Sequence, residues 1–539
     1  MLSEAFGGTH ARRAASKWYR LGVLLVVPAV AFGACSGPAA TQAPVSAQPG
    51  SSAEAPAATQ PPAVATSITI ATPGGFSHLD QAIHNGAATG VDIVLSYNVT
   101  QTLVKFGPNG ELEPLLADSW EVPQADIIRF HLKQGVTFSD GSPWNAEVAR
   151  LNFDYMARFP GGAADTEFPS VTNVEAVDEY TLDITHDPEP AIPVIFTTNA
   201  RMYSGKQIQE NPGTIATGPI GSGPYVITSF NPTSGMTLEA RDDYWGTAPT
   251  IEAITYKFLP EPGTRLAALQ SGEAQLILDL LPDDAKGLSS DQVITGPGIE
   301  MYNLRFDMKN PVISDVRVRK AINLAIDRTQ LVALFSGLAD IASGNQLWPS
   351  WVTGWYDEPP IQQDLAQAKA LVEEAGAVGQ SVGYLTSIGR YPLFGEVTDV
   401  VASEIEQTGL KVEVNKDPHS QWLVDYRVLE NPPWGIAQGS FGYDSAPDAT
   451  NNLRKKVMCG GIMSLYCSST YDDLANQALA ETDVAKRTEI IKQMQAIIAQ
   501  DQPFSALVSP RVIYGKSPNL TLTTYPNGFL SVGDMELAE

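Results

Sequence analysis

The chain has 539 residues, of which 34 are lysine or arginine and 60 are aspartate or glutamate, so its formal net charge is −26. This acidity excludes proteins that bind nucleic acid or anionic lipid mainly through basic residues, because both ligands are negatively charged and bind to positively charged protein surfaces. Only 17% of the residues are charged and 43% are apolar, which is typical of packed cores. Three cysteines are too few for a disulfide scaffold, and the length predicts about three domains.

The amino terminus has the order of features found in an export signal. Four basic residues precede the apolar run LGVLLVVPAVAF at 21–32, and small residues then lead to Cys35. The run is too short to cross a bilayer, and the pattern is typical of a cleaved signal. It resembles a bacterial lipoprotein signal, although Phe32 stands where such signals usually carry leucine. The resemblance implies that Cys35 is the lipidated first residue, and the alternative is an ordinary signal with an incidental cysteine.

Residues 36–66 are rich in alanine and proline and carry one charged residue, Glu54. They show no hydrophobic periodicity, so burial cannot offset the entropy lost on ordering them. We therefore predict a signal peptide at 1–35 and a disordered tether at 36–66. Residues 67–539 contain no further apolar run long enough to span a bilayer.

The remaining chain interleaves predicted strands and helices. Strand patterns occur at 67–72, 129–132, 182–185, 223–227, 255–259 and 410–414. Ser314 can cap a helix that continues through Ala325, and Asp364 can cap another that ends before Gly376. Asp483 precedes a third helix with apolar residues at core spacing. The pattern predicts a mixed α/β protein with several subdomains.

Six motifs in chain order resemble the family 5 extracellular solute-binding proteins of bacterial ABC importers, the peptide- and nickel-binding type. They are PLLADSWEV at 114–122, FHLKQGVTFSDGSP at 130–143, GSGPY at 221–225, RDDYW at 241–245, AALQSGE at 267–273 and the stretch 315–327. Their shared order over most of residues 67–515 makes the resemblance far more specific than any single motif.

The resemblance implies a two-lobed clamshell of the periplasmic-binding-protein kind, an α/β fold of the large type II-like class with an accessory subdomain. Lobe I would combine 67–106, 218–303 and 514–539, with 107–217 as its accessory subdomain. Lobe II would span 304–513, which places the hinge near 303–305 and 510–514. The ligand would lie between the lobes, and closure would exclude water.

Candidate ligand-binding residues lie mostly in the predicted second lobe. The segment after residue 441 resembles the place where peptide binders put an aspartate for the ligand's ammonium group, with Asp448 the closer match and Asp444 the alternative. Aromatic residues in loops predict a stacking wall, although some of them would simply pack in cores. The full set of candidates is Asp448, Asp444, Trp434, Trp422, Tyr443, Arg390 and Trp348.

Enzymatic and metal-binding motifs are weak. Gly379 to Gly383 matches the hydrolase pattern G-x-S-x-G, but the elements expected around Ser381 are in the wrong order for that motif. The histidines show no metal-binding spacing, so we predict no metal, no cofactor and no catalytic residue. Cys459 and Cys467 lie close together in an exported chain, which favours a local disulfide.

The expected function is therefore that of a lipid-tethered receptor on the outer face of the cytoplasmic membrane, or in the periplasm. It would be a monomer that delivers a small polar ligand, a peptide in the leading hypothesis, to an ABC permease with a separate ATPase. It would bind no nucleic acid. The alternatives are cello-oligosaccharide or nickel-chelate binding in the same fold, or an extracellular hydrolase.

Overall fold

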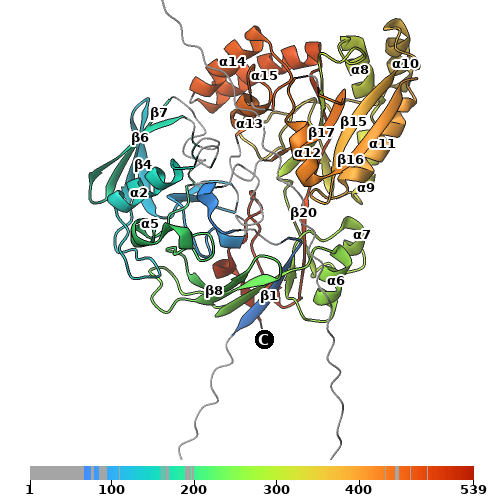
Figure 1. Ribbon diagram of the computed structural model, residues 1–539. Helices are drawn as coiled ribbons and strands as arrows, with labels where there is room; N and C mark the ends of the chain where they lie inside the picture. Colours follow the sequence, from blue (N-terminus) through green and yellow to red (C-terminus); the bar gives the residue numbers. More distant parts are fainter. Residues whose placement is uncertain are drawn as a thin grey trace, which may run out of the picture. The chain divides into compact units, whose positions relative to one another are not determined.

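The computed structural model describes residues 66–538 except 75–77, 84–93, 109, 160–161, 163, 165–167, 169, 188–195, 197–199, 431, 443–447, 462 and 482. The predicted signal, Cys35 and nearly all of the predicted tether lie outside the described residues, as do Tyr443 and Asp444. Residues from Val64 to Glu539 form one compact unit, and Figure 1 labels many of its helices and strands.

A seven-stranded sheet brings together the start, the middle and the end of this unit. Its strand order is β12 (Val293–Gly296), β20 (Val512–Lys516), β11 (Leu276–Ile277), β1 (Ser67–Thr72), β10 (Ala253–Phe258), β9 (Gly235–Ala240) and β8 (Tyr225–Asn231). The central strand β1 pairs in parallel with both β10 and β11. Helix α6 (Pro262–Gln270) packs Ala268 and Leu269 against this sheet, and α7 (Pro282–Ala285) follows β11.

A five-stranded sheet forms the centre of the second lobe. Its order is β16 (Lys411–Pro418), β15 (Ser381–Ile388), β17 (Ile436–Gly442), β13 (Glu300–Phe306) and β18 (Phe504–Ala506). Apolar faces of α8 (Val316–Ala325), α9 (Arg328–Leu334), α10 (Leu365–Glu374) and α11 (Phe394–Glu406) share one core with it. A second core joins α13 (Ala449–Lys456), α14 (Ser469–Ala480) and α15 (Val484–Asp501).

A four-stranded antiparallel sheet forms a third core, within the segment predicted as the accessory subdomain. Its order is β4 (Ala117–Gln124), β5 (Ile127–Leu132), β7 (Thr181–His186) and β6 (Val171–Asp178), and α2 (Ala146–Met156) packs on it. The remaining elements are short: η1 (Gln81–Ile83), β2 (Val104–Phe106), β3 (Leu112–Pro114), α5 (Gly205–Glu210), η2 (Pro212–Thr214), β14 (Ala339–Ile341), α12 (His419–Tyr426), β19 (Val508–Pro510), β21 (Leu520–Thr521), η3 (Val532–Asp534) and β22 (Glu536–Leu537).

Helix ends follow the sequence signals closely. Asp364 caps α10 by accepting the Gln367 N–H, and Gly376 beyond its end has a φ of 66°. Asp483 caps α15 in the same way. The cap of α8 is Asp315 rather than Ser314, because the Asp315 carboxylate accepts the N–H of Arg317 and has the extended backbone of a cap.

Two short segments connect the seven-stranded and five-stranded sheets. Residues 297–299 lead from β12 to β13, and residues 507–511, which include β19, lead from β18 to β20. All of β13 belongs to the five-stranded sheet, so the first crossing precedes Glu300 and lies a few residues before the predicted hinge. Among the described residues, no helix has the length and apolar character needed to cross a membrane.

Candidate ligand-binding site

One candidate residue, Arg390, lies at an edge of the five-stranded sheet. Strands β15, β16 and β17 are parallel, so they end at the same edge. Arg390 follows β15 and His419 follows β16, while Tyr443 and Asp444 follow β17 in the sequence. In open α/β sheets, ligands bind beyond the carboxyl ends of the strands. This edge is therefore the candidate ligand-binding edge of the second lobe.

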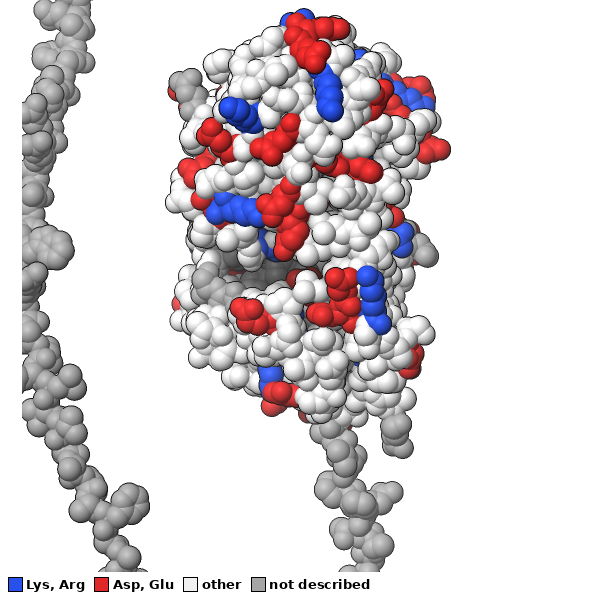
Figure 2. All heavy atoms as spheres, turned by 90° about the vertical axis from the view of Figure 1, so that its right-hand side faces the viewer, with Lys and Arg blue, Asp and Glu red and all other residues white. Residues whose placement is uncertain are grey.

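The seven-stranded sheet presents its own carboxyl edge to the same region. Strand β12 runs in the direction of β11, because both are antiparallel to β20. The chain thus leaves β12 at the carboxyl edge of one sheet and enters β13 at Glu300, which pairs with the last residue of β17. The crossing segment consequently joins the two carboxyl edges. Figure 2 shows one side of the molecule hollowed, with acidic and basic side chains at the rim of the hollow.

Asp279 lies just beyond β11, on the carboxyl edge of the seven-stranded sheet. Its backbone is left-handed, with a φ of 50°, and its main-chain oxygen accepts a hydrogen bond of 2.9 Å from Arg265 Nη2. Its side chain is exposed, yet desolvation raises the pKa of the carboxyl group, while the charges of Arg265 and Arg390 act to lower it.

Arg390 lies on a constrained loop at the carboxyl edge of the five-stranded sheet. The loop is bounded by two residues of positive φ, Gly389 at 84° and Leu393 at 52°. Tyr302 fixes its middle by donating its hydroxyl to the Pro392 carbonyl at 2.9 Å. The Arg390 side chain is exposed, and its guanidinium lies 5.3 Å from the Tyr391 ring centroid. This geometry presents a cation at the end of β15.

His419 begins a stack of rings behind that loop. Its ring stacks on Trp422 at 5.2 Å, and Trp422 stacks on Tyr426 at 4.4 Å. Its Nδ1 lies 3.1 Å from the Ser387 hydroxyl. Burial, with a further contribution from the charge of Arg390, lowers the pKa of His419 to about 4. The imidazole is therefore neutral at pH 7, when one of its ring nitrogens donates and the other accepts.

The guanidinium of Arg305 continues this stack between two rings. It lies 3.8 Å from the centroid of Tyr426 and 5.0 Å from that of Trp434. It donates to the main-chain carbonyls of Met463 and Tyr426. Desolvation lowers the pKa of Arg305, the expected effect on a buried cation. Arg305 thus fastens α12 and the loop around Met463 to the sheet.

The three candidate tryptophans lie inside the protein. Trp422 is 3% exposed and Trp434 is 4% exposed, and Trp434 Nε1 donates to the Asp425 carbonyl at 3.1 Å. Trp348 is fully buried in the core shared by α13, α14 and α15. In this arrangement the three rings are packed inside the protein. The predicted stacking wall would require them to become accessible to a ligand.

Asp448 is also buried, and its carboxylate is engaged on both oxygens. Oδ1 accepts the Thr450 N–H at 2.9 Å and so caps α13, while Oδ2 lies 3.0 Å from Arg487 Nη2. Both charged side chains are 3% exposed. A ligand ammonium at Asp448 would have to displace a buried arginine from its counter-ion, which is costly in the low dielectric of an interior. In this structure Asp448 is therefore an anchor for α13.

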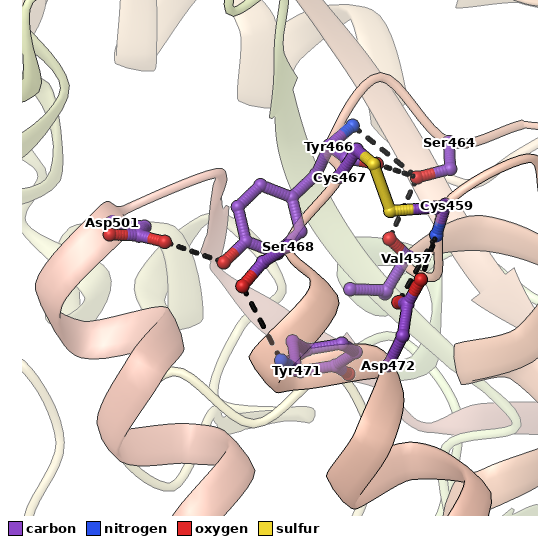
Figure 3. Close-up of a disulfide and its surroundings, with 9 residues drawn as sticks. All are labelled: Val457, Cys459, Ser464, Tyr466, Cys467, Ser468, Tyr471, Asp472 and Asp501. Carbon is purple, nitrogen blue, oxygen red and sulfur yellow. Dashed lines mark hydrogen bonds between the residues drawn. A yellow bond between two sulfur atoms is a disulfide. The ribbon is translucent and has the colours of Figure 1, made fainter.

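A disulfide joins Cys459 to Cys467 in the loop that follows α13 (Figure 3). The Asp472 carboxylate of α14 accepts the Cys459 N–H at 3.2 Å, and Tyr466 donates its hydroxyl to Asp501 of α15 at 2.6 Å. The loop is thus bound to two helices as well as closed on itself. It stabilises the same helical core that buries Asp448 and Trp348.

Catalytic and metal-binding arrangements find little support in these residues. Ser381 is the first residue of β15 and not the turn between a strand and a helix that the hydrolase motif requires. Within the described part of the chain, no group of three or more histidine, cysteine, aspartate or glutamate side chains is arranged to hold a metal ion.

Among the residues described at these edges, the sequence had singled out Arg390 as a candidate, but not Asp279, His419 or Arg305. Asp279 lies in the run LILDLLPDD, where nothing distinguishes it from the acidic residues that follow. A usable signal was the position of Asp279 after the short strand β11, since polar residues beyond parallel strands are typical of ligand-binding edges. His419 gives the same signal after β16.

Comparison with known proteins gives a consistent result. The family model described as bacterial extracellular solute-binding proteins, family 5 Middle, matches residues 111–459. The glutathione-binding protein GsiB of Escherichia coli (strain K12) is 24% identical over 474 residues, covering 85% of this chain and 91% of the relative. GsiB of Shigella boydii serotype 4 (strain Sb227) matches with the same identity and coverage.

Two solved structures illustrate the likeness in fold. The periplasmic binding protein DppA from Helicobacter pylori, in complex with the peptide STSA, has a TM-score of 0.74 and 21% identity, covering 88% of this chain and 99% of that one. NikA from Brucella suis, in complex with Fe(III)-EDTA, has a TM-score of 0.77 and 20% identity, covering 88% of this chain and 100% of that one. The two-lobed clamshell expected from the sequence is thereby confirmed.

Proposed function

The chain belongs to the bacterial extracellular solute-binding proteins of family 5, and from this premise we propose that it captures a peptide between its two lobes and delivers it to an ABC transporter permease. The observation that carries the proposal is the exposed guanidinium of Arg390 at the carboxyl edge of the five-stranded sheet. A guanidinium binds a carboxylate through two parallel hydrogen bonds. Every linear peptide with a free carboxyl terminus offers such a group.

The neighbours of Arg390 suit the polar backbone of a peptide. His419 is neutral at pH 7, and the Ser387 hydroxyl lies beside it, so this edge offers both donors and acceptors. Tyr443 and Asp444, two further candidates, follow β17 in the sequence. In this proposal the tryptophans hold His419 and α12 in place, and Asp448 holds α13.

A thermal-shift screen tests the ligand class. The purified chain without residues 1–65 would be mixed with a casein digest filtered below 1 kDa, with cello-oligosaccharides and with nickel–histidine chelate. Binding to the folded state raises the melting temperature, so the proposal expects the digest to raise it most. A rise with the oligosaccharides or the chelate alone would contradict peptide binding, and turnover of an added substrate would indicate a hydrolase.

We also propose that Cys35 is lipidated and that the body works as a monomer beside the outer face of the cytoplasmic membrane. Such a receptor needs an ATPase on a separate polypeptide, because the sequence has no G-x-x-x-x-G-K-[ST] motif. Labelling with radioactive palmitate tests the anchor. The label should enter the full chain and be lost in Cys35→Ala, and equal labelling of both would contradict it.

A further inference from the structure

We propose that residues 336–338 form an interlobe brace, which holds the two lobes in the arrangement of this structure and opposes their closure around a ligand. The segment joins α9 to β14 in the second lobe, and it contacts the first lobe through a hydrogen bond and an apolar side chain. The inference goes beyond the proposed function, because it concerns the movement of the lobes and not the identity of the ligand. The brace sets affinity from outside the candidate ligand-binding site.

The hydrogen bond joins the brace to α7 of the first lobe. Ser336 Oγ donates to Asp283 Oδ1 at 2.7 Å. The same carboxylate lies 2.9 Å from Lys286 Nζ within α7. The hydrogen bond from Ser336, followed by that from Lys286, lowers the pKa of Asp283, so the acceptor is ionised at pH 7. A hydrogen bond to an ionised acceptor is stronger than one between neutral groups.

The apolar contact is made by Leu338. Its half-buried side chain packs against the core that α6, β11 and β20 share in the first lobe, which includes Leu269, Ile277 and Ile513. Removing apolar surface from water is favourable, so this contact stabilises the lobe arrangement in which it is made. The brace therefore combines a polar and an apolar contact with the first lobe.

The backbone of the brace is strained. Ser336 has a φ of 56° and Gly337 a φ of 83°. Glycine adopts this left-handed conformation freely, whereas serine adopts it rarely and at a cost in energy. The turn is held from within the second lobe, because Phe335 is buried in its core and the Gly337 N–H donates to the Val332 carbonyl at 3.0 Å. Strain that a fold maintains in this way is an indication of a functional constraint.

The brace is also fixed to the second crossing segment, residues 507–511. The Leu338 carbonyl accepts the Arg511 N–H at 3.0 Å, and β14 pairs with β19. Leu338 therefore lies beside the place where the lobes rotate, and Ser336 lies farther along the chain from it. A rotation that moved Ser336 by about 1 Å away from Asp283 would take the two oxygens out of hydrogen-bond range. Closure of the lobes consequently breaks this bond.

The brace favours the open arrangement of the lobes. In this structure the brace is formed while one side of the molecule is hollowed, as Figure 2 shows. A contact made only in the open form lowers the population of the closed form, and a ligand that needs the closed form then binds more weakly. Loss of the brace should therefore tighten ligand binding.

The first test measures the distance between the lobes without any ligand. It uses the chain without residues 1–65, with one nitroxide label on each lobe at Glu239→Cys and Lys369→Cys, two exposed positions. The cysteines at 459 and 467 are not labelled, because they form the disulfide. Electron paramagnetic resonance then gives the distribution of distances between the two labels.

The brace variants are Ser336→Ala, which removes the hydroxyl, and Leu338→Ala, which removes most of the apolar contact. The matched control is Ser314→Ala, because the Ser314 hydroxyl is exposed and bonds within the second lobe, to the Pro311 carbonyl at 3.3 Å. Far-ultraviolet circular dichroism and the melting temperature establish that each variant is folded. Calorimetry uses a synthetic copy of the peptide that the wild type retains most strongly from the casein digest, identified by mass spectrometry.

We expect the wild type and Ser314→Ala to give the same distribution of distances without ligand. Ser336→Ala and Leu338→Ala should differ from them and resemble the wild type saturated with the peptide. Ser336→Ala should bind the peptide about threefold more tightly and Leu338→Ala about tenfold, as expected for a larger closed population.

Unchanged distributions in both brace variants, or the same shift in Ser314→Ala, would overturn the brace. Unchanged or weaker peptide binding by the brace variants would overturn it too, and so would a lower melting temperature with neither of the other changes. If the wild type retains no peptide from the digest, the proposed function fails, and the distances without ligand alone decide whether the brace exists.

Discussion

Two aspartates on different lobes occupy comparable places and have different environments. Asp279 follows β11 on the seven-stranded sheet, and Asp448 lies in the segment after β17 on the five-stranded sheet. Asp448 is 2% exposed and is paired with Arg487, whereas Asp279 is exposed and receives no hydrogen bond on its carboxylate within the described residues. One carboxylate is held in a buried ion pair, and the other is exposed.

The packing around each of these two carboxylates determines whether it is buried in an ion pair or exposed. Arg487 comes from α15 and reaches Asp448 inside a hydrophobic core, so the ion pair is shielded from water and from ligands. Arg265 approaches Asp279 too, but it donates to main-chain oxygens and leaves the carboxylate unused. The same residue types therefore give a buried ion pair in one lobe and an exposed carboxylate in the other.

The largest expected effect is on stability, in Asp448→Asn. The substitution leaves the Arg487 guanidinium buried without its counter-ion, which typically costs about 3–5 kcal/mol. Urea unfolding followed by tryptophan fluorescence should show this loss in the free energy of unfolding. Asp473→Asn, which removes an exposed charge from α14, serves as the control and should change stability little. A stable Asp448→Asn protein with abolished peptide binding would make Asp448 a ligand contact.

The disulfide is the next largest contribution to the same region. Replacing both cysteines by serine should lower the free energy of unfolding by roughly 2–3 kcal/mol, the loop-closure value for a short loop. Thermal unfolding of the double variant beside the oxidised wild type measures it. If peptide affinity stays within twofold of wild type, the helical core around Asp448 acts in stability and not in binding. Two titratable thiols in the denatured wild type would contradict the disulfide.

Glu404 gives an intermediate case, a carboxylate that is buried and only partly bonded. Its Oε1 accepts the Asp327 N–H at 3.2 Å, while its Oε2 has no hydrogen-bond partner in the described part of the chain. Burial raises its pKa to about 7, so the folded state binds more protons than the unfolded state between about pH 4.5 and 7. This group therefore lowers stability as the pH rises through that range.

The variant Glu404→Gln isolates that contribution. It should be more stable than wild type by roughly 1–3 kcal/mol at pH 8, and the difference should shrink towards pH 4.5. Melting temperatures of both proteins across pH 4.5–8 provide the measurement. A difference independent of pH would contradict a raised pKa at this site.

The smallest expected change in free energy is the loss of binding free energy in Arg390→Gln. This variant bears most directly on ligand binding. Removing the guanidinium should weaken peptide binding about tenfold, equivalent to ~1.4 kcal/mol. The free energy of unfolding should not change, because the side chain is exposed. Calorimetry and urea unfolding of the same preparation measure both quantities. An unchanged affinity would remove Arg390 from the proposed site.

Sequence reasoning recovered what local patterns determine. The caps at Asp364 and Asp483 and the alternating strand at Ser67 depend on neighbouring residues, so they could be predicted. The role of Asp448 could not, because its partner Arg487 lies on a distant helix. The burial of Trp348 and the stacking of Arg305 between rings likewise depend on tertiary contacts. A polar residue in a loop gives no sign of such contacts.

We propose that the two lobes enclose a peptide. Native mass spectrometry of the protein purified from its own bacterial source is the direct test of this proposal. We expect bound peptides with free amino and carboxyl termini, released on unfolding and identifiable by fragmentation. Recovery of oligosaccharide or metal chelate in their place would contradict it.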